Sequence, residues 1–395
     1  MKRSFDVDSI LKTLRSVFPT DKDFISLHEP QFSGNEWNYV KECLDTGWVS
    51  SVGKYVDKFE QQLAQYTGVK RAVAVVNGTS ALHICLRLAG VSYDDEVLMP
   101  AMTFVATANA VKYCGAIPHF VDSEEKTLGV DPRKLSTYLA EIADVSSKGC
   151  INQLTGRRLK ALIAVHTFGH PVDLSSLSEL CNNYNIALIE DAAESVGSFY
   201  KEKHTGNWGL VSAISFNGNK IITTGGGGAI LTNSEEIGAL AKHITTTAKL
   251  PHKWAFNHDM VGYNYRMPNI NAALGCAQIE QLPVFLKEKR KLAERYQFAF
   301  RRMEGISLFK EPVFSKSNYW LNTILLDKDY ADGRDMLVEV TNNNGIMTRP
   351  PWTLMHKLPM FKKCLHMDLT VSEDLEKRLI SIPSSASLGV MDANV

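Results

Sequence analysis

The stretch SAISFNGNKIITTGGGGAILT, residues 212–232, places one lysine between two predicted strands. Residues 213–216 are apolar enough for a buried strand, and residues 229–232 predict a second one. Lys220 lies in the polar loop between them and is followed by four consecutive glycines, residues 225–228. Burying an ammonium group is costly unless its pKa falls or its charge is neutralised. One chemical reason to hold a lysine there is to form an imine with an aldehyde; a surface lysine in a turn is the alternative.

Composition limits the class of protein. The chain has 395 residues, enough for two domains, and its 45% hydrophobic and 22% charged residues are typical of a soluble globular protein. Lys plus Arg equals Asp plus Glu at 43 each, so no net charge favours a nucleic acid or membrane partner. No apolar run reaches the ~18 residues that span a bilayer, and residues 1–19 predict an amphipathic helix instead of a signal peptide. Seven scattered cysteines without a CxxC pair indicate reduced thiols in the cytoplasm, and no metal site is expected.

Apolar strands alternate with helices in the first half of the chain. Strands are predicted near residues 71–76, 96–100, 118–122, 161–166 and 186–191, and helices near residues 79–90, 105–114, 132–142 and 174–184. This alternation indicates an α/β protein with a largely parallel sheet that helices cover on both faces. In such sheets ligands bind at the carboxyl ends of the strands, where Thr103, Phe104, His166 and Asp191 are found.

An N-terminal extension and two domains are predicted along the chain. Residues 1–22 form a helical extension, residues 23–283 a large domain, and residues 284–395 a connector helix with a small C-terminal domain. In the large domain, Ser33 and Glu36 have the spacing of a capping box, so a helix is predicted there with Trp37, Val40 and Leu44 facing inward. Residues 145–159 are predicted to be a surface loop, and the small domain to contain a strand at 319–327, a helix at 332–345 and an irregular segment at 346–361.

The segment NGTSAL predicts a turn at Asn77 and Gly78 and a helix that begins near Thr79. Backbone N–H groups, the hydroxyls of Thr79 and Ser80 and the helix dipole would together suit a phosphate. Plain capping by Thr79 or Ser80 is the alternative.

Other polar groups offer further contacts to a ligand. Asp191 precedes two alanines, small enough for a flat ring to approach, and would pair with a protonated ring nitrogen or cap the next turn. Residues 263–266 concentrate rings and donors, which is typical of interfaces and ligand sites. The glycine run precedes a strand and not a helix, so a dinucleotide-binding GxGxxG motif is excluded.

A phosphate site, an aromatic residue, an acid and a lysine are the contacts that hold pyridoxal phosphate. In their order along the chain they resemble the sugar aminotransferases of the DegT/DnrJ/EryC1/StrS family. The resemblance covers nearly the whole chain, through NGTSAL, PAMTFVATANA, VHTFGHPVD, IEDAAES, SFNGNKIITTGGGGAI and GYNYRMPNINAALG. Through FISLHEP, VSSVGKYVDKFE and RPPWTLMH the chain is most similar to the LegC and PglE type, which aminates a nucleotide-linked 4-keto-6-deoxy-N-acetylhexosamine.

The resemblance implies the aspartate aminotransferase fold (fold type I), with a mixed seven-stranded sheet, a smaller C-terminal α/β domain and a homodimer with shared active sites. It implies that Lys220 bonds to pyridoxal phosphate, that Asp191 keeps the ring nitrogen protonated, and that Phe104 stacks on the ring. The other cofactor positions that it implies are Gly78, Thr79, Ser80, Ala193, Glu194, Ser215 and Asn217, with Asn264 of the partner subunit reaching the phosphate. The candidate substrate positions, chosen for their charge, rings and place in the sequence, are Trp48, Ser51, Tyr265, Arg266, Arg349, Trp352 and His356.

The resemblance also implies a reaction. Glutamate gives its amino group, pyridoxamine phosphate is the intermediate form of the cofactor, and a 4-keto sugar on UDP accepts the amine. One branch of the family has histidine in place of the lysine and removes a hydroxyl, so Lys220 indicates amino transfer. A GDP-linked or 3-keto sugar, a non-catalytic regulator that binds pyridoxal phosphate, and a structural protein without cofactor remain alternatives.

Overall fold

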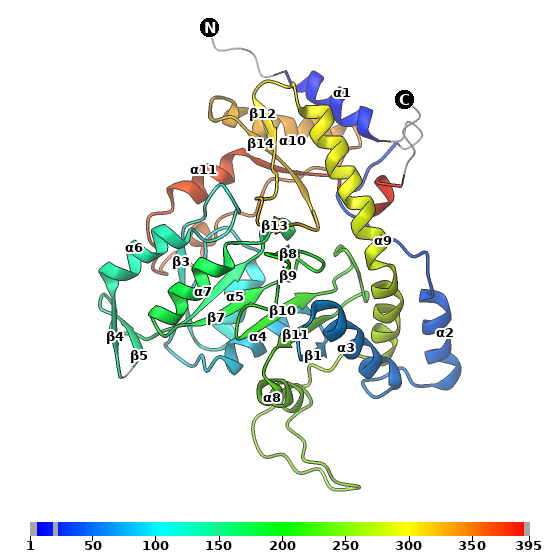
Figure 1. Cartoon of the computed structure of the whole chain (residues 1–395), viewed down its shortest axis with the longest axis vertical. Coiled ribbons are helices and arrows are strands. Elements are labelled where there is room, and N and C mark those ends of the chain that lie inside the picture. The colour runs from blue at the N-terminus through cyan, green and yellow to red at the C-terminus, as the bar shows by residue number, and fades with distance from the viewer. Residues whose placement is uncertain (1–5, 19–22, 148, 391–395) are drawn as a thin grey trace.

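A mixed seven-stranded sheet forms the centre of the computed structural model, which describes residues 6–18, 23–147 and 149–390 (Figure 1). In spatial order its strands are β1 (Arg71–Val75), β11 (Gly228–Thr232), β10 (Val211–Ser215), β7 (Ala187–Asp191), β6 (Leu159–Val165), β2 (Glu96–Pro100) and β3 (Ile117–Val121). Strand β11 runs antiparallel to β1 and β10, and the other neighbouring pairs are parallel. The predicted α/β class and mixed sheet are confirmed.

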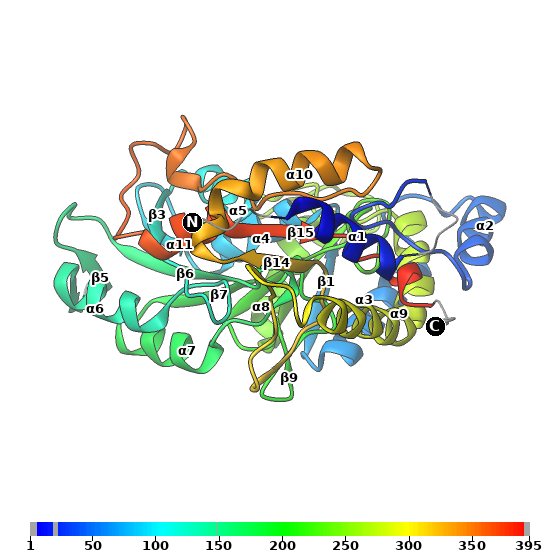
Figure 2. The same cartoon turned by 90° about the horizontal axis from the view of Figure 1, so that it is seen from above.

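Helices cover both faces of this sheet, which explains why every residue of β2, β10 and β11 is buried. Figure 2 shows α4 and α5 on one side of the sheet and α7 on the other. The helices around the sheet are α3 (Lys54–Thr67), α4 (Gly78–Leu88), α5 (Val105–Tyr113), α6 (Pro132–Ile142), α7 (Leu174–Asn183) and α8 (Glu235–Thr245). Asp131 and Asp173 cap α6 and α7 through their side chains, so these two helices begin where the sequence predicts.

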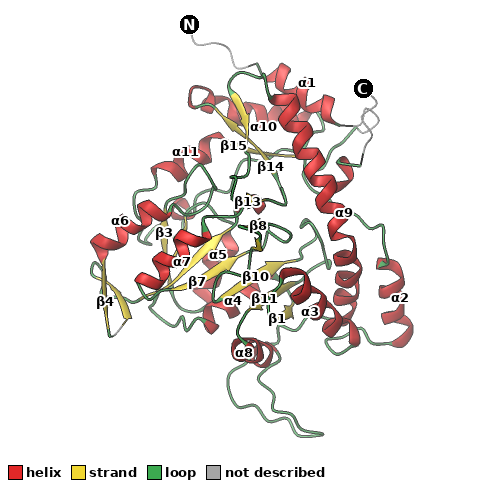
Figure 3. Cartoon of the chain, viewed as in Figure 1, coloured by secondary structure: helices red, strands yellow, loops and turns green. Residues whose placement is uncertain are grey.

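The long helix α9 (Asn269–Phe300) joins the central sheet to a second, smaller sheet. It passes through Pro283 without a break, so the helices predicted near residue 269 and over residues 284–303 are one helix. The domain division at residue 283 stays a prediction. The smaller sheet has the order β12 (Ile306–Leu308), β14 (Asn322–Leu326), β15 (Leu379–Ile382), and α1 (Val7–Val17), α10 (Arg334–Asn343) and α11 (Thr370–Arg378) lie around it (Figure 3). Helix α1 belongs to the predicted N-terminal extension, residues 1–22. Residues 1–5 and 19–22 of that extension are outside the described residues.

The remaining elements are short. They are the hairpin β4 (Ala143–Ser146) and β5 (Gly149–Asn152), the strands β8 (Phe199–Tyr200), β9 (Lys203–His204) and β13 (Ser315–Lys316), and four 3₁₀ turns, Thr167–Gly169, Lys328–Gly333, Met355–Lys357 and Ala386–Leu388.

In the described part of the chain no helix is long and apolar enough to cross a membrane, and no group of three His, Cys, Asp or Glu side chains is placed to hold a metal ion.

Two local predictions are wrong. The segment predicted as a surface loop at 145–159 is only partly a loop, because it contains the end of β4, all of β5 and the first residue of β6. Helix α2 (Glu36–Thr46) does not bury Trp37 and Leu44, which are 76% and 58% exposed. The helix packs on α9 through Cys43 and Glu36. The Glu36 carboxylate accepts a hydrogen bond of 2.7 Å from the side chain of Gln278 on α9. It does not form the predicted capping box with Ser33.

Candidate active site

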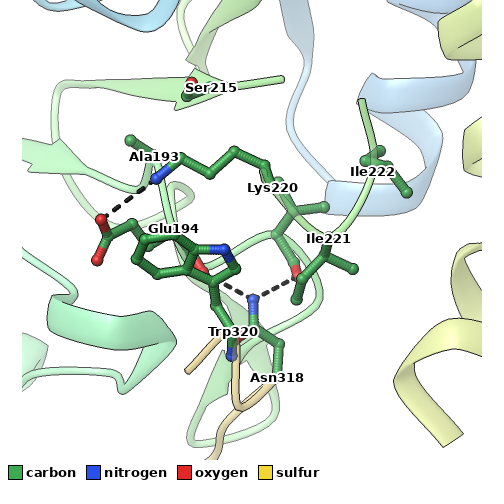
Figure 4. A pocket seen from close by; sticks show the side chains of 9 residues that line it. Ala193, Glu194, Ser215, Lys220, Ile221, Ile222, Asn318 and Trp320 are labelled. Carbon is green, nitrogen blue, oxygen red and sulfur yellow. Dashed lines mark hydrogen bonds and ion pairs between the residues drawn. The ribbon is translucent and has the colours of Figure 1, made fainter. Parts of the chain in front are cut away.

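Lys220 lies in the loop that joins β10 to β11, at the carboxyl edge of the parallel strands. Its side chain is only 14% exposed, and its Nζ lies 3.2 Å from Glu194 Oε1 and 3.8 Å from the centroid of the Trp320 ring (Figure 4). The amine of this largely covered side chain thus lies between a carboxylate and an aromatic face. The alternative of a surface lysine in a turn is excluded.

Asp191 is the last residue of β7, which pairs in parallel with β10, so both strands end at the same edge. Its Oδ2 accepts a hydrogen bond of 2.8 Å from Thr107 Oγ1, and its Oδ1 accepts one of 3.2 Å from the N–H of Ala193. Burial raises the pKa of Asp191, and the charge of Lys220 counteracts only part of that rise. No cation pairs directly with Asp191 among the described residues, and a protonated ring nitrogen would be the missing partner.

Glu194 connects the lysine to a neighbouring loop. Its Oε2 accepts a hydrogen bond of 2.9 Å from the N–H of Phe168, a residue in the left-handed region at φ 56°. Burial raises the pKa of Glu194, while the charge of Lys220 acts to lower it. Glu194 is therefore fixed from one side by a backbone donor and presents its other oxygen to the Lys220 amine.

The start of α4 lies against the strands that flank Lys220. Asn77 caps the helix by accepting a hydrogen bond of 2.7 Å from the N–H of Ser80, so neither Thr79 nor Ser80 is the cap. A Cβ placed on Gly78 would lie 2.9 Å from Ser215 Cβ, and one on Gly228 would lie 2.5 Å from the carbonyl carbon of Asn77. Both glycines thus permit close backbone approach, which brings the first N–H groups of α4 beside the Ser215 hydroxyl and leaves the hydroxyls of Thr79 and Ser80 free of the capping role.

These groups fit pyridoxal phosphate. A helix N-terminus with Ser215 suits the phosphate, the buried Asp191 without a cation suits the ring nitrogen, and the Lys220 amine suits the aldehyde. One pocket is lined by Ala193, Glu194, Val196, Ser215, Lys220, Ile221, Ile222, Asn318 and Trp320 (Figure 4).

Three aromatic rings lie in a row from Phe168, whose N–H binds Glu194, through Trp352 to the exposed Phe104. The ring of Trp352 stacks on Phe168 with centroids 5.1 Å apart and planes at 29°, and Phe104 lies 6.4 Å from Trp352. Phe104 is 52% exposed and precedes α5, at the carboxyl end of β2. We use the term aromatic wall for Phe104, Trp352 and Phe168.

Comparison with known proteins decides between the chemistries that this site allows. The sequence pattern of the DegT/DnrJ/EryC1/StrS aminotransferase family matches residues 30–394. The chain is 38% identical to GDP-perosamine synthase of Escherichia coli O157:H7 over 92% of this chain and 94% of that protein, and 38% identical to GDP-perosamine synthase of Vibrio cholerae over 91% and 94%. The crystal structure of the aminotransferase TlmJ from Streptoalloteichus hindustanus superposes with a TM-score of 0.83 at 26% identity, over 94% of this chain and 95% of that one.

The chain belongs to the DegT/DnrJ/EryC1/StrS aminotransferase family. It is therefore an enzyme of the sugar aminotransferase class with fold type I, and its cofactor is pyridoxal phosphate. The alternatives of a regulator and of a structural protein are thereby set aside.

In this aminotransferase the segment 263–266 lies beside α4. Tyr265 Oη is 3.3 Å from His83 Nδ1, and its ring stacks on Tyr263 with centroids 5.2 Å apart. The guanidinium of Arg266 is 3.3 Å from Asn264 Oδ1, and both side chains are at least partly exposed. None of these residues is among those that line the Lys220 pocket of the described chain, so their roles toward substrate stay predictions.

The other predicted ligand contacts of the aminotransferase are dispersed. Asn217 is exposed on the Lys220 loop and bonds Asn219, and Arg349 is exposed beside the smaller sheet. His356 Nε2 lies 3.4 Å from Glu373 of α11. Trp48, which is 58% exposed, and Ser51 belong to a loop that is held by α9, because Asn269 Nδ2 donates a hydrogen bond of 2.6 Å to the Trp48 carbonyl.

Sequence reasoning missed several residues of the aminotransferase site, namely Thr107, Phe168, Val196, Ile221, Ile222, Asn318 and Trp320. Thr107 follows Phe104 by three residues in PAMTFVATANA. Residues three apart lie on the same side of a helix, so this spacing could have placed Thr107 on the same side as Phe104. Trp320 lies in the strand predicted at 319–327, but β14 begins only at Asn322. No local pattern links residues 318–320 to Lys220, because the contact is made through the fold.

Proposed function

We propose that this enzyme transfers the amino group of glutamate to C4 of a 4-keto-6-deoxy sugar linked to a nucleoside diphosphate. The observation that carries the proposal is the Lys220 amine, which lies between Glu194 and Trp320 at the strand edge where Asp191 ends β7. Glutamate is the donor that the family resemblance implies. The nucleotide sugar is supported by the relatives whose names specify a GDP-linked product.

We assign the roles of the chain's own residues as follows. Ser215, Thr79, Ser80 and the N–H groups at the start of α4 bind the cofactor phosphate, and Asp191 holds a proton on the ring nitrogen. Phe104 contacts the ring face, and Gly78, Ala193 and Asn217 complete the surroundings of the cofactor. The bound cofactor supplies an electron-withdrawing ring that stabilises negative charge at the reacting carbon.

Lys220 carries the proton in both halves of the reaction in this proposal. With the cofactor bound, its Nζ would move a proton from the α-carbon of glutamate to C4′ of the cofactor, and in the second half from C4′ to C4 of the sugar. Glu194, at 3.2 Å, stabilises the ammonium form and orients it, and the Trp320 face at 3.8 Å does the same from another side. Burial of both groups limits access of water to the amine.

Two nucleotide classes fit the proposal. The 38% identity to proteins named GDP-perosamine synthase favours a guanosine diphosphate carrier. The motifs FISLHEP, VSSVGKYVDKFE and RPPWTLMH, which resemble the LegC and PglE type, favour a UDP-linked N-acetyl sugar. Arg266, Arg349, Trp352 and His356 offer charge and ring surfaces for either nucleotide.

The proposal includes a homodimer. The segment between α8 and α9 extends away from the rest of the chain at the bottom of Figure 1 and carries Trp254, Phe256 and Val261, which are 78%, 76% and 85% exposed. Exposed apolar side chains on a projecting segment favour a protein partner, and Asn264 of the partner subunit would then reach the cofactor phosphate. All seven cysteines are unpaired, which supports a reducing, cytoplasmic location.

A substrate panel tests the function. Purified enzyme with pyridoxal phosphate and glutamate is incubated with GDP-linked and UDP-linked 4-keto-6-deoxy sugars, with and without a 2-acetamido group, and with 3-keto isomers. Mass spectrometry of the products detects replacement of the ketone by an amine. We expect amination of a 4-keto substrate. Conversion of only 3-keto sugars, or of none, would contradict the proposal.

A further inference from the structure

A second lysine, Lys289, is completely buried in the middle of α9. Its Nζ donates hydrogen bonds to the carbonyl of Trp320, at 3.2 Å, and to the carbonyl of Ser384. Among the described residues no carboxylate pairs with it. Burial holds the pKa of Lys289 well below its usual range. A methionine would fill this space without the desolvation cost, so the hydrogen bonds to the two carbonyls are the feature that only the lysine provides.

Trp320 connects this buried lysine to the reacting one. The backbone N–H of Trp320 donates to Asn318 Oδ1 at 2.8 Å, and its indole N–H donates to the carbonyl of Asn219, next to Lys220, also at 2.8 Å. With the Lys289 bond to its carbonyl, the residue is held at three points. Figure 4 shows the indole beside the Lys220 side chain, next to Glu194. The position of this ring relative to the Lys220 amine is thus set by polar contacts and not by packing alone.

His28 lies in the same buried region as the two lysines. Its ring nitrogens are buried without a hydrogen-bond partner among the described residues. Burial, then the charge of Lys289 and that of Lys220, hold the pKa of His28 well below its usual range. The segment of His28 is tied to the second carbonyl that Lys289 binds, because Ser384 N–H donates to the Leu27 carbonyl at 2.7 Å.

We propose that Lys289 is a positioning residue for amino transfer: it fixes the Trp320 carbonyl and thereby holds the indole against the Lys220 amine. The inference rests on the proposed role of Lys220. Without the Lys289 bond, the Trp320 and Ser384 carbonyls lose a buried donor and the loop of residues 318–320 relaxes. The indole then no longer covers Lys220, and the amine loses its fixed direction toward the reacting carbon. Small misplacements of this kind lower kcat by about 10- to 100-fold.

The test uses Lys289→Met, which keeps the length of the side chain and removes the donor. Lys291→Met on the same helix is the matched control, since Lys291 is exposed and pairs with Glu288. In Lys289→Met we expect kcat to fall about tenfold or more with KM for both substrates changed less than about threefold. In the cofactor-free protein we expect acetic anhydride to modify Lys220 several times faster than in the wild type, as measured by mass spectrometry of the Lys220 peptide.

Trp320→Leu provides a second, independent variant. It should accelerate the modification of Lys220 to the same extent as Lys289→Met, and the double variant should add little, because both changes act through one contact. Unchanged Lys220 modification in Trp320→Leu would overturn the inference even if Lys289→Met failed to fold. Loss of thermal stability in Lys289→Met with wild-type kcat and wild-type modification of Lys220 would also overturn it. Turnover by Lys220→Ala would instead contradict the proposed function, so the two failures are distinguishable.

Discussion

Thr107 donates a hydrogen bond of 2.8 Å from its hydroxyl to Oδ2 of Asp191. Thr107 belongs to α5 and Asp191 ends β7, so this bond joins a covering helix to the carboxyl edge of the sheet. The Thr107 hydroxyl is itself 2.9 Å from the hydroxyl of Thr103. Two threonines thus fix the direction of a carboxylate that otherwise accepts only the N–H of Ala193 among the described residues.

Thr107→Val should weaken cofactor binding. The change keeps the shape of the side chain but removes a donor to a buried, charged acceptor, an interaction of about 1.5–3 kcal/mol. We expect the Kd of pyridoxal phosphate to rise roughly tenfold or more, as measured by absorbance titration of the cofactor-free enzyme. Thr245→Val on α8 removes a similarly buried hydroxyl, bonded to the Ala241 carbonyl, and should leave this Kd unchanged. Equal Kd values for the two variants would contradict the role of Thr107.

Asp191→Asn should stabilise the cofactor-free protein at neutral pH. Because burial raises the pKa of Asp191, the folded state binds its proton more tightly than the unfolded chain does. The free energy of unfolding therefore falls as the pH rises from the pKa of Asp191 in the unfolded chain to its raised pKa in the folded protein. Above the folded-state pKa it stays at the lower value. We expect the Tm of Asp191→Asn to exceed that of the wild type by a few degrees near pH 8, and the difference to vanish as the pH is lowered.

Asp173→Asn is the control with the opposite sign. Hydrogen bonds from Tyr200 and Ser176 hold the pKa of Asp173 below its usual value despite its partial burial. Its stabilising contribution is present above the unfolded pKa and is lost as the pH falls, so Asp173→Asn should lower the Tm near neutral pH. Differential scanning fluorimetry over a pH series measures both. A lower Tm for Asp191→Asn at every pH would refute the prediction.

Gly228→Ala should impair the phosphate site, whereas Gly226→Ala should not. A Cβ on Gly228 would lie 2.5 Å from the carbonyl carbon of Asn77 and would push β11 away from the start of α4. A Cβ on Gly226 meets no atom within 4 Å. We expect Gly228→Ala to lose about 1–3 kcal/mol of stability and to bind pyridoxal phosphate more weakly, and Gly226→Ala to stay within about 0.5 kcal/mol of the wild type. Chemical denaturation measures the stability and cofactor titration measures the affinity for pyridoxal phosphate. If Gly228→Ala lost no more of either than Gly226→Ala does, the prediction would be wrong.

Sequence patterns predicted the parts of this molecule that follow from local periodicity and chain order. The strands that end at Asp191 and before Lys220 are short apolar runs, and parallel strands bring their carboxyl ends to one edge. That rule is sufficient to expect the acid and the lysine together. The sequence of the glycine run only excluded a dinucleotide-binding motif, and the structure alone assigns the close approach to Gly228 and the open space to Gly226.

The other contacts depend on packing that no short pattern encodes. Trp320 reaches Lys220 because α9 and the chain after it return residues 318–320 to the sheet edge, about a hundred positions further along. Trp37 is in a helix with a plausible inward face, yet that helix is oriented by its contact with α9 through Cys43 and Glu36. Tyr319 adopts a left-handed φ of 48°, which ends the predicted strand on its N-terminal side.

Lys220→Ala should abolish turnover while the fold is kept. The amine is required as the group that bonds to the cofactor and as the base and acid of the proposed reaction, so we expect kcat to fall by at least about 10³-fold. Circular dichroism and size-exclusion chromatography should match the wild type. The Trp320 face and Glu194 then lose their cation, and added primary amines should restore a small part of the activity. Wild-type turnover by this variant would exclude the assignment.

Trp352→Leu should separate the two substrates of the enzyme. Its ring stacks on Phe168 and lies 6.4 Å from Phe104, so the aromatic wall offers a flat surface beside the proposed site of amino transfer. Loss of ring stacking, about 0.5–1.5 kcal/mol beyond the buried area, should raise KM for the nucleotide sugar roughly three- to tenfold. The half-reaction with glutamate, followed by the change in cofactor absorbance in stopped flow, should keep its rate because glutamate has no ring to stack. Phe298→Leu replaces an exposed ring on α9 and should change neither value. An equal loss in both half-reactions would place Trp352 with the cofactor instead of the nucleotide sugar.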